Sequence, residues 1–286
     1  MKKRVLITGA KGFVGSHLVN ELQSDYEVIS FVRENNGDLC SCKSFPTVDI
    51  IIHIAGKIPH HGNKPYDVIK NNVLSTINLC DNYKTLETKP LIMYCSSAET
   101  QVSATEQFNY EIPTNEQCPF VMNNYVKMSY GASKSIGEQI IVNSGLPYII
   151  FKLHNVYGPG QYGQFIGDYI DRANNGDYKL YGHNNTRSWL YITDLVDALK
   201  LLMSTKNAVN EVFNIGHSSE VSVLEVARTI HDALGIKADP IIDKNDKNVT
   251  RRCPNIDKIY DFTGWKPKIN LAEGIAKTVK AYLENR

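Results

Sequence analysis

Near the start of the chain stands the stretch Lys3-Arg4-Val5-Leu6-Ile7-Thr8-Gly9-Ala10-Lys11-Gly12-Phe13-Val14-Gly15, which decides the fold that we expect. An apolar run leads into three glycines spaced three residues apart, and apolar residues at helical spacing follow them. A strand, a glycine turn and a helix in this order are typical of a dinucleotide-binding βαβ unit. The spacing is G-x-x-G-x-x-G and not the dehydrogenase G-x-G-x-x-G, so a flexible loop ahead of an ordinary helix is the alternative.

Each glycine of this turn has its own expected task. Gly9 permits the tight turn, Gly12 lets the backbone close on a pyrophosphate, and Gly15 lets the helix and the strand approach each other. The pyrophosphate would lie at the positive N-terminal end of the new helix. Together with Phe13 and Val14, these glycines form the first part of the expected cofactor site.

Composition limits the classes of function. The chain has 286 residues, of which 42% are hydrophobic, and this length suffices for a large α/β domain with a smaller lobe. A net charge of +1 argues against a nucleic-acid surface, because no basic excess is present to displace counterions. No apolar stretch approaches a membrane span, and no signal-peptide pattern precedes the first strand, so we expect a cytoplasmic protein with no membrane partner.

The cysteines do not indicate a metal site. None of the six forms a C-x-x-C pair, and Cys40 and Cys42 are not accompanied by a second Cys/His pair at ligand spacing. We therefore expect reduced thiols and no bound metal.

The second expected strand, residues 26–32, ends at Arg33. An acidic residue near this point binds the ribose 2′-hydroxyl of NAD, whereas an arginine suits the 2′-phosphate of NADP. This favours NADP(H), with NAD(H) as the alternative if Arg33 is only a solvated charge. Residues 34–48 are too few for a full strand and helix, so we expect a trimmed crossover, with Asp38 and Leu39 approaching the adenine.

A continuous apolar run over residues 48–56 predicts a buried parallel strand. Its end at Ala55 and Gly56 is expected to pass close beneath the cofactor. His53 within the run is expected to be a packed, hydrogen-bonded core residue. We expect a helix from Asn71 to about residue 82 and a further buried strand at residues 91–95.

Hydroxyl and ammonium groups mark the expected catalytic site. Ser97 follows the strand at residues 91–95, at the sheet edge where doubly wound sheets bind ligands. Tyr130 and Lys134 are four residues apart in an expected helix, so they share one face. A nearby ammonium would lower the pKa of the phenol towards neutrality, as a general acid/base requires. The alternative is an ordinary amphipathic helix with a capping serine nearby.

These features resemble the extended short-chain dehydrogenase/reductases of the NAD-dependent epimerase/dehydratase family, whose members act on nucleotide sugars. The matching motifs run in the order of the family: Thr8-Gly9-x-x-Gly12-x-x-Gly15, Asp49-x-x-x-His53-x-Ala55, Asn72-Val73, Ser96-Ser97-Ala98, Tyr130-x-x-x-Lys134, Asn155-Val156-Tyr157-Gly158-Pro159-Gly160, Arg187-x-x-x-Tyr191-Ile192-x-Asp194 and Gly264-Trp265-Lys266-Pro267. The resemblance implies an α/β fold with a Rossmann-type doubly wound parallel sheet and a smaller α/β substrate-binding lobe on the C-terminal side.

The resemblance also implies roles for single residues. Tyr130 would be the acid/base, Lys134 would hold the nicotinamide ribose and orient the tyrosine, and Ser97 would bind the reacting oxygen. Asn72 would belong to the cofactor site.

We expect a dinucleotide-binding domain over residues 1–164, completed by later strands from the second half, and mainly a nucleotide-sugar-binding lobe over residues 165–286. The resemblance implies that Asn155 contacts the sugar nucleotide. A diphosphate needs guanidinium groups, and similar proteins place arginines at the positions of Arg187 and the pair Arg251-Arg252. Of that pair we favour Arg252.

Reactions of this family move a hydride between a sugar carbon, usually C4, and the nicotinamide. The arginine after the second strand and the trimmed crossover favour a 4-keto-sugar reductase, with a 4-epimerase as the first alternative. A 4,6-dehydratase or decarboxylase is the next, because Glu99 stands where those enzymes carry a catalytic glutamate. A non-catalytic cofactor-sensing protein is a remote alternative, since such a relative would be expected to lose the Tyr130–Lys134 pair.

The resemblance also implies a homodimer. Family members pair through two helices of each subunit, which here would be the helix after Asn71 and the helix that carries Tyr130. The loop from residue 101 to residue 129 is expected to cover the sugar.

Overall fold

The computed structural model describes residues 2–59, 62–101, 110–121, 128–243 and 249–284. Contacts between residues divide the chain into two compact units. Unit 1 contains Met1–Gln101, Gln117–Leu153 and Leu199–Phe213, and unit 2 contains Val102–Glu116, His154–Ala198 and Asn214–Arg286. This division differs from a single boundary at residue 164, because the chain enters unit 2 directly after its fifth strand and returns to unit 1 before its tenth.

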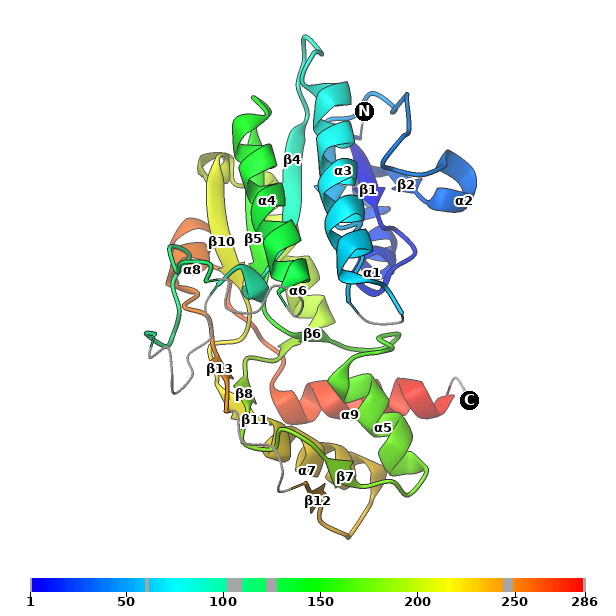
Figure 1. Ribbon diagram of the computed structural model, residues 1–286, viewed down its shortest axis with the longest axis vertical. Helices are drawn as coiled ribbons and strands as arrows, with labels where there is room; N and C mark the ends of the chain where they lie inside the picture. The colour runs from blue at the N-terminus through cyan, green and yellow to red at the C-terminus, as the bar shows by residue number, and fades with distance from the viewer. Residues whose placement is uncertain (1, 60–61, 102–109, 122–127, 244–248, 285–286) are drawn as a thin grey trace. The chain divides into compact units, whose positions relative to one another are not determined.

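A six-stranded sheet forms the centre of unit 1, in the order β10-β5-β4-β3-β1-β2 (Figure 1). The strands are β1 (Arg4–Thr8), β2 (Glu27–Phe31), β3 (Ile50–His53), β4 (Leu91–Ser97), β5 (Tyr148–Leu153) and β10 (Glu211–Ile215). The pairs β1–β2, β1–β3, β3–β4 and β4–β5 are parallel. After β2 the chain crosses to the other side of β1, so the sheet is doubly wound, and the predicted Rossmann-type fold is confirmed.

Helices cover both faces of this sheet. The helices α3 (Pro65–Tyr83) and α4 (Ser129–Asn143) pack against each other in front of it, and α1 (Phe13–Leu22) contacts β1 and β2 (Figure 1). Alternate residues of the strands fill the core on one face, because side chains of a strand point to opposite faces in turn. That core contains Leu6, Ile51, Ile92, Tyr94 and Ile150, together with residues of α3 and α4.

One helix differs from the expectations, and the connection after β2 agrees with them. The helix α3 begins at Pro65 and not at Asn71, because proline fits the first turn of a helix, where its missing N–H is not needed. The stretch after β2 forms a single short helix, α2 (Arg33–Asn36), and the next strand in the chain is β3. The trimmed crossover is therefore confirmed.

Unit 2 consists of short strands and amphipathic helices. A three-stranded sheet has the order β11-β8-β13, and two-stranded sheets join β12 with β7 and β6 with β9. Its strands are β6 (Val156–Tyr157), β7 (Lys179–Leu180), β8 (Thr186–Arg187), β9 (Leu190–Tyr191), β11 (Val221–Ser222), β12 (Ile241–Ile242) and β13 (Arg251–Arg252). Its helices include α5 (Phe165–Asn174), α7 (Val223–Leu234), α8 (Asp257–Thr263) and α9 (Leu271–Glu284), and α7 packs against α5 and α9.

The helix α6 (Ile192–Ser204) runs from unit 2 into unit 1, and two 3₁₀ turns lie at Ala98–Thr100 and Lys206–Ala208. In the part of the chain that the structure describes, every helix is too short or too polar to cross a bilayer.

Candidate active site

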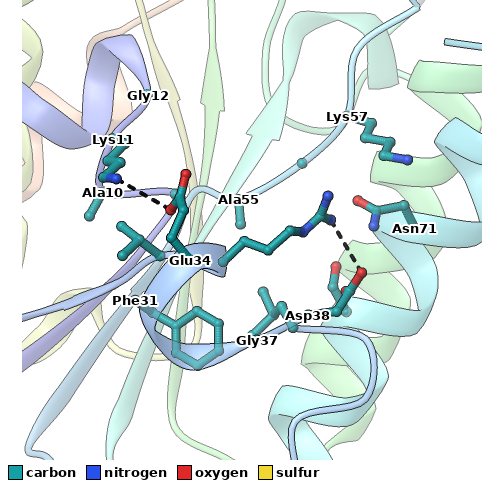
Figure 2. Close-up of a pocket in the computed structure, with 16 residues that line it drawn as sticks. Ala10, Lys11, Gly12, Phe31, Glu34, Gly37, Asp38, Ala55, Lys57 and Asn71 are labelled. Atoms are coloured by element: carbon teal, nitrogen blue, oxygen red, sulfur yellow. Dashed lines mark ion pairs between the residues drawn. The ribbon is translucent and has the colours of Figure 1, made fainter.

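A cavity of about 320 Å³ opens at the carboxyl ends of β1, β2 and β3 (Figure 2). This is where the winding direction of the sheet changes, and doubly wound sheets bind their ligands at such a point. The cavity is lined by Gly9, Ala10, Lys11, Gly12, Phe31, Val32, Arg33, Glu34, Gly37, Asp38, Leu39, Ala55, Gly56, Lys57, Asn71 and Ser75.

The glycine turn forms one wall of this cavity. Gly9 has a φ of +74°, and a Cβ there would lie 2.9 Å from the backbone nitrogen of Ala55. Gly15 lies beneath the turn, where a Cβ would clash with the carbonyl oxygen of Gly9. Exposed backbone at the N-terminus of α1 with no side chains in the way fits the pyrophosphate of a dinucleotide.

Charged side chains also line the cavity. Arg33 forms an ion pair with Asp38 at 3.3 Å, and Lys11 forms one with Glu34 at 3.3 Å (Figure 2). A backbone hydrogen bond from Cys40 lowers the pKa of Asp38, and the nearby Arg33 contributes to this shift. Lys57 adds a third cation to the lining. The cavity therefore presents three cations and two carboxylates, an arrangement that suits an anionic ligand.

The structure brings most of the predicted cofactor residues together. Seven of them line the cavity: Gly9, Gly12, Arg33, Asp38, Leu39, Ala55 and Gly56. Phe13 and Val14 belong to the first turn of α1, next to the lining residue Gly12. Sequence reasoning missed Lys11, Glu34 and Lys57, although Lys11 lies within the glycine turn itself and Lys57 directly follows the predicted Ala55-Gly56.

Asn72 does not line the cavity, and its side chain forms hydrogen bonds between neighbouring elements of unit 1. It is 2% exposed; its Oδ1 accepts a hydrogen bond from the Lys57 N–H, and its Nδ2 donates to the Ser133 hydroxyl. Asn72 thereby joins α3 to the loop after β3 and to α4. Its predicted place at the cofactor remains a prediction.

Ser97, Tyr130 and Lys134 lie at the carboxyl end of β4 and on the first turns of α4. Ser97 ends the strand, and its Oγ accepts a hydrogen bond from the Glu99 N–H at 3.1 Å. The Nζ of Lys134 donates to the Cys95 carbonyl oxygen at 2.8 Å and lies 5.8 Å from the ring centre of Tyr130. The Ser97 hydroxyl lies near enough to the Tyr130 phenol to lower the pKa of that phenol. The three predicted side chains therefore form one cluster.

The pKa of Tyr130 differs from the expectation. Burial raises it above the ordinary value for a phenol, and the neighbouring Cys95 and Glu99 raise it further, while the nearby Ser97 hydroxyl lowers it. Burial also lowers the pKa of Lys134. The expected shift of Tyr130 towards neutrality is not found, because loss of hydration exceeds every favourable interaction with the phenolate. The phenol is protonated at neutral pH.

Glu99 lies beside the same cluster. Its backbone is so close to the first turn of α4 that a Cβ on Gly131 would clash with the Glu99 carbonyl oxygen. The charge of Glu99 contributes to the raised pKa of Tyr130. The side chain of Glu99 is half-buried.

His53 is a packed core residue, as predicted. It is 1% exposed, its Nδ1 lies 2.8 Å from the Thr8 hydroxyl, and its Nε2 lies 3.1 Å from the Thr76 hydroxyl. The Thr76 hydroxyl donates to the Asn72 carbonyl, so it accepts from Nε2, and Nδ1 accepts from Thr8. Burial lowers the pKa of His53 to about 3, and the charge of Lys134 contributes.

In unit 2, Asn155 and Arg187 line a separate cavity of about 220 Å³, together with Val156, Gln161, Gln164, Phe165, Ile166, Tyr181, Asn185, Trp189 and Val223. Asn155 has a φ of 27°, and its Nδ2 donates to the Ser188 carbonyl. Two nitrogens of the Arg187 guanidinium donate to Thr250, which fixes the plane of this group.

The parallel pairing of β8 with β13 explains which of the neighbouring arginines faces Arg187. Arg252 stands opposite Arg187 in the register, so both side chains lie on one face of the small sheet. Arg251 points to the other face, where its guanidinium forms a bidentate ion pair with Glu220 at 2.7 and 2.6 Å. Two guanidinium groups on one face of a sheet suit an anion such as a diphosphate.

Residues 102–109 and 122–127 of the loop expected to cover the sugar lie outside the described residues. Among the residues that are described, no group of three or more His, Cys, Asp and Glu side chains is placed to hold a metal ion.

Comparison with known proteins identifies the family of this chain. The chain matches the NAD dependent epimerase/dehydratase family over residues 5–216. A putative UDP-glucose 4-epimerase of Methanocaldococcus jannaschii is 29% identical over 307 residues, which cover 96% of this chain and 97% of that protein. A trifunctional UDP-glucose 4,6-dehydratase/UDP-4-keto-6-deoxy-D-glucose 3,5-epimerase/UDP-4-keto-L-rhamnose-reductase of Arabidopsis thaliana is 28% identical over 323 residues. That match covers 99% of this chain and 48% of the relative, so the chain spans about half the length of that protein.

Solved structures share the fold. RMD from Pseudomonas aeruginosa, complexed with NADPH, has a TM-score of 0.85 at 22% identity, covering 99% of this chain and 100% of its own. The dTDP-glucose 4,6-dehydratase of Bacillus anthracis, in complex with NAD, has a TM-score of 0.81 at 24% identity, covering 99% and 97%. Because the family match extends over most of the sequence, the chain belongs to the NAD-dependent epimerase/dehydratase family.

Proposed function

We propose that the chain is an NAD(P)-dependent oxidoreductase that moves a hydride at C4 of a nucleotide sugar, and that it works as a 4-keto-sugar reductase. The observation that carries the choice of reaction is Arg33 in the lining of the cavity, because an arginine there suits the 2′-phosphate of NADP(H), the dissociable cofactor of a reductase. The raised pKa of Tyr130 agrees with this choice. Reduction of a ketone needs a proton donor beside the carbonyl oxygen, whereas oxidation of a sugar hydroxyl, with which an epimerase or a dehydratase begins, needs a base. A raised pKa favours the donor.

The residues of unit 1 divide the work of such a reduction. A bound nicotinamide nucleotide supplies the hydride. The Ser97 hydroxyl holds the ketone oxygen, and Tyr130 gives its proton to that oxygen as negative charge develops. The ammonium of Lys134 stabilises the phenolate that remains. The Glu99 N–H donates a hydrogen bond to the Ser97 oxygen, which leaves the Ser97 hydroxyl proton to donate to the ketone.

Arg33 supports NADP(H) as the preferred cofactor. Its side chain lines the cavity and is 64% exposed, so it can turn towards a 2′-phosphate. Lys11 and Lys57 add positive charge to the lining of the same cavity. Of the two fold neighbours described above, one is complexed with NADPH and the other with NAD.

A dehydratase or decarboxylase is the second candidate, and the position of Glu99 favours it. A carboxylate near the acid/base tyrosine could remove a proton from a sugar carbon after oxidation at C4. UDP-glucuronic acid decarboxylases and a 4,6-dehydratase are among the relatives of this chain.

The substrate class follows from unit 2. We infer that Arg187 and Arg252 bind the diphosphate of a nucleotide sugar and that Asn155 contacts the same ligand. The relatives named above act on UDP-activated sugars according to their names, so UDP sugars are the first compounds to try.

The first experiment identifies the cofactor. The purified protein is denatured, any released nucleotide is identified, and the binding of NADPH and NADH is measured by fluorescence. We expect an empty site that prefers NADPH. Stoichiometric, tightly held NAD would contradict the reductase and favour the epimerase or the dehydratase, because those reactions return the hydride within one turnover.

Two substitutions sharpen this experiment because they act in opposite directions. Arg33→Ala should weaken NADPH binding about tenfold and leave NADH binding unchanged, since it removes a charge-assisted contact to the 2′-phosphate. Asp38→Asn should strengthen NADPH binding, since it removes the carboxylate that competes for Arg33. Lys43→Ala removes an exposed cation outside the lining and serves as the matched control. An equal loss for both nucleotides in Arg33→Ala would contradict the assignment.

The second experiment identifies the reaction. NADPH oxidation is followed with UDP- and dTDP-4-keto-6-deoxyglucose, and UDP-glucose, UDP-galactose and UDP-glucuronic acid are tested with NAD by NMR. We expect turnover with a 4-keto sugar only. Tyr130→Phe should abolish turnover and spare NADPH binding; unchanged turnover would contradict the catalytic role and would leave the cofactor-sensing alternative standing.

A further inference from the structure

A buried ion pair lies directly beneath the proposed catalytic cluster. Glu138 of α4 and Lys152 of β5 are joined at 3.3 Å between Oε2 and Nζ, with side-chain exposures of 15% and 6%. In every other ion pair between described residues, at least one partner is about a third exposed or more. A buried pair adds little stability, because removing two charges from water costs about as much as their attraction returns. The pair therefore calls for a role other than stability.

The ion pair ties three elements together at one level of the sheet. Lys152 stands opposite Ser96 in the register of β4 and β5, so both side chains point to the face that α4 covers. Glu138 reaches both of them, since its Oε2 contacts Lys152 and its Oε1 accepts a hydrogen bond from the Ser96 hydroxyl. Lys152 thus holds the carboxylate in the position from which it binds Ser96.

A second tie runs parallel to the first. The Nζ of Lys134 donates to the carbonyl oxygen of Cys95 at 2.8 Å. Cys95 and Ser96 are consecutive on β4, while Lys134 and Glu138 are one helical turn apart on α4. Two hydrogen bonds between the same strand and helix fix both the rotation and the translation of α4 against the end of β4. A single hydrogen bond would leave the rotation free.

These ties decide where the reacting groups meet. Ser97 directly follows Cys95 and Ser96, the two residues of β4 that bind α4. Tyr130 comes one helical turn before Lys134, the first residue of α4 that binds β4. We propose that Glu138, held by Lys152, is a positioning residue that sets the contact between the Ser97 hydroxyl and the Tyr130 phenol. This inference rests on the proposed function, in which that contact receives the ketone oxygen.

The charge of Glu138 acts in the same direction. It raises the pKa of Lys134 and so opposes the effect of burial on that ammonium. Glu138 therefore helps to keep Lys134 charged, as a stabiliser of the Tyr130 phenolate must be.

The test compares turnover with stability in matched variants. Glu138→Gln and Lys152→Met each leave one buried charge without its partner, and each should lower kcat by about 10- to 100-fold with the dissociation constant of NADPH unchanged. Lys152→Arg keeps the ion pair and should restore kcat. Glu27→Gln removes a carboxylate from the exposed pair with Arg4 and is the control, with no effect expected.

The double variant Glu138→Gln/Lys152→Met separates positioning from stability. Replacing both charges together removes the unpaired charge, so the unfolding midpoint should return towards the wild-type value while kcat stays low. If kcat recovers together with stability, or if the single variants keep wild-type kcat, the positioning role is wrong.

A crystal structure of Glu138→Ala tests the same role without any substrate. We expect the Ser97 hydroxyl to move relative to the Tyr130 phenol when compared with a crystal structure of the wild type, and an unchanged distance between the two groups would overturn the proposal. This outcome is independent of the panel of sugars, whereas wild-type turnover in Tyr130→Phe would overturn the proposed function itself.

Discussion

Burial sets the charge of two titratable rings near the carboxyl end of the sheet, Tyr130 and His53. Loss of hydration raises the pKa of the phenol by more than the nearby Ser97 hydroxyl lowers it, so the phenol keeps its proton. The imidazole lies between two threonine hydroxyls that leave its Nδ1 only a proton to accept, so it stays neutral. The sequence predicted that His53 is a packed, hydrogen-bonded residue but did not predict the raised pKa of Tyr130, because the burial of a side chain depends on packing with residues far away in the chain.

The protonated phenol has a consequence for the pH dependence of reduction. In single turnovers of a 4-keto sugar with saturating NADPH, we expect the rate to stay constant from about pH 6 to about pH 9, since Tyr130 remains a proton donor over this range. Stopped-flow absorbance of NADPH measures this rate. A fall with an apparent pKa near 7 would show that the phenol ionises much more readily than its burial indicates.

The lowered pKa of His53 predicts that the folded protein loses stability in acid. Its pKa is about 3 in the folded protein and 6.5 in the reference state, so the unfolded chain binds one more proton between these values. Stability therefore falls as the pH falls through this window, by up to about 1.4 kcal/mol per pH unit. From pH 7 to pH 5 the contribution is about 2 kcal/mol.

Urea unfolding at these two pH values measures the effect. His53→Gln should show a smaller difference between pH 7 and pH 5 than the wild type, by about 2 kcal/mol. His17→Gln alters a histidine of the surface helix α1 and should keep the wild-type difference. Equal differences in all three proteins would show that His53 does not titrate as the buried site requires.

At the scale of elements, periodicity and glycine spacing predicted the sheet and most helices, because each strand carries its own apolar pattern. The start of α3 was missed, since a proline six residues before Asn71 reads equally well as a loop. Ser96 and Ser97 belong to β4 itself and not to a loop after it, because β5 pairs with them to the end of the strand. Lys152 gave no signal in the sequence, as its partner Glu138 comes from another element.

The glycine turn makes a prediction of its own. Alanine at Gly15 would gain about 1 kcal/mol from helix propensity, but its Cβ would clash with the backbone of Gly9. Overpacking of this kind costs about 1 to 3 kcal/mol, and a rigid backbone atom cannot move aside, so Gly15→Ala should lower stability and weaken NADPH binding. Ser16→Ala changes the exposed neighbouring position on the same helix and should stay within about 0.5 kcal/mol of the wild type. Thermal unfolding with and without NADPH measures both effects. A wild-type unfolding midpoint and a wild-type shift with NADPH in Gly15→Ala would contradict the close approach of the helix and the turn.

For the whole molecule, the division into units follows the sheet and not the order of the sequence. Strand β10 completes the sheet of unit 1 from late in the chain, as the resemblance implied for the later strands. The residues proposed for chemistry belong to unit 1, and those proposed for the nucleotide sugar belong to unit 2. A boundary at one residue could not be placed from the sequence, because residues 110–116 belong to unit 2 although the stretches before residue 102 and after residue 116 belong to unit 1.

The packed pair of α3 and α4 leaves apolar side chains exposed that a second copy of the chain would cover. Leu74 and Ile77 on α3 are 40% and 37% exposed, and Ile136 and Val142 on α4 are each 43% exposed. The resemblance to the family implies pairing through these two helices, so we expect a dimer of about twice 32.2 kDa by light scattering. Ile136→Glu should weaken the dimer at least tenfold, roughly the effect of burying an unpaired carboxylate. Leu283→Glu on α9 alters a leucine that is 49% exposed in unit 2, and it should leave the mass unchanged. A wild-type protein of single-chain mass, or a dimer that survives Ile136→Glu, would show that these helices face solvent.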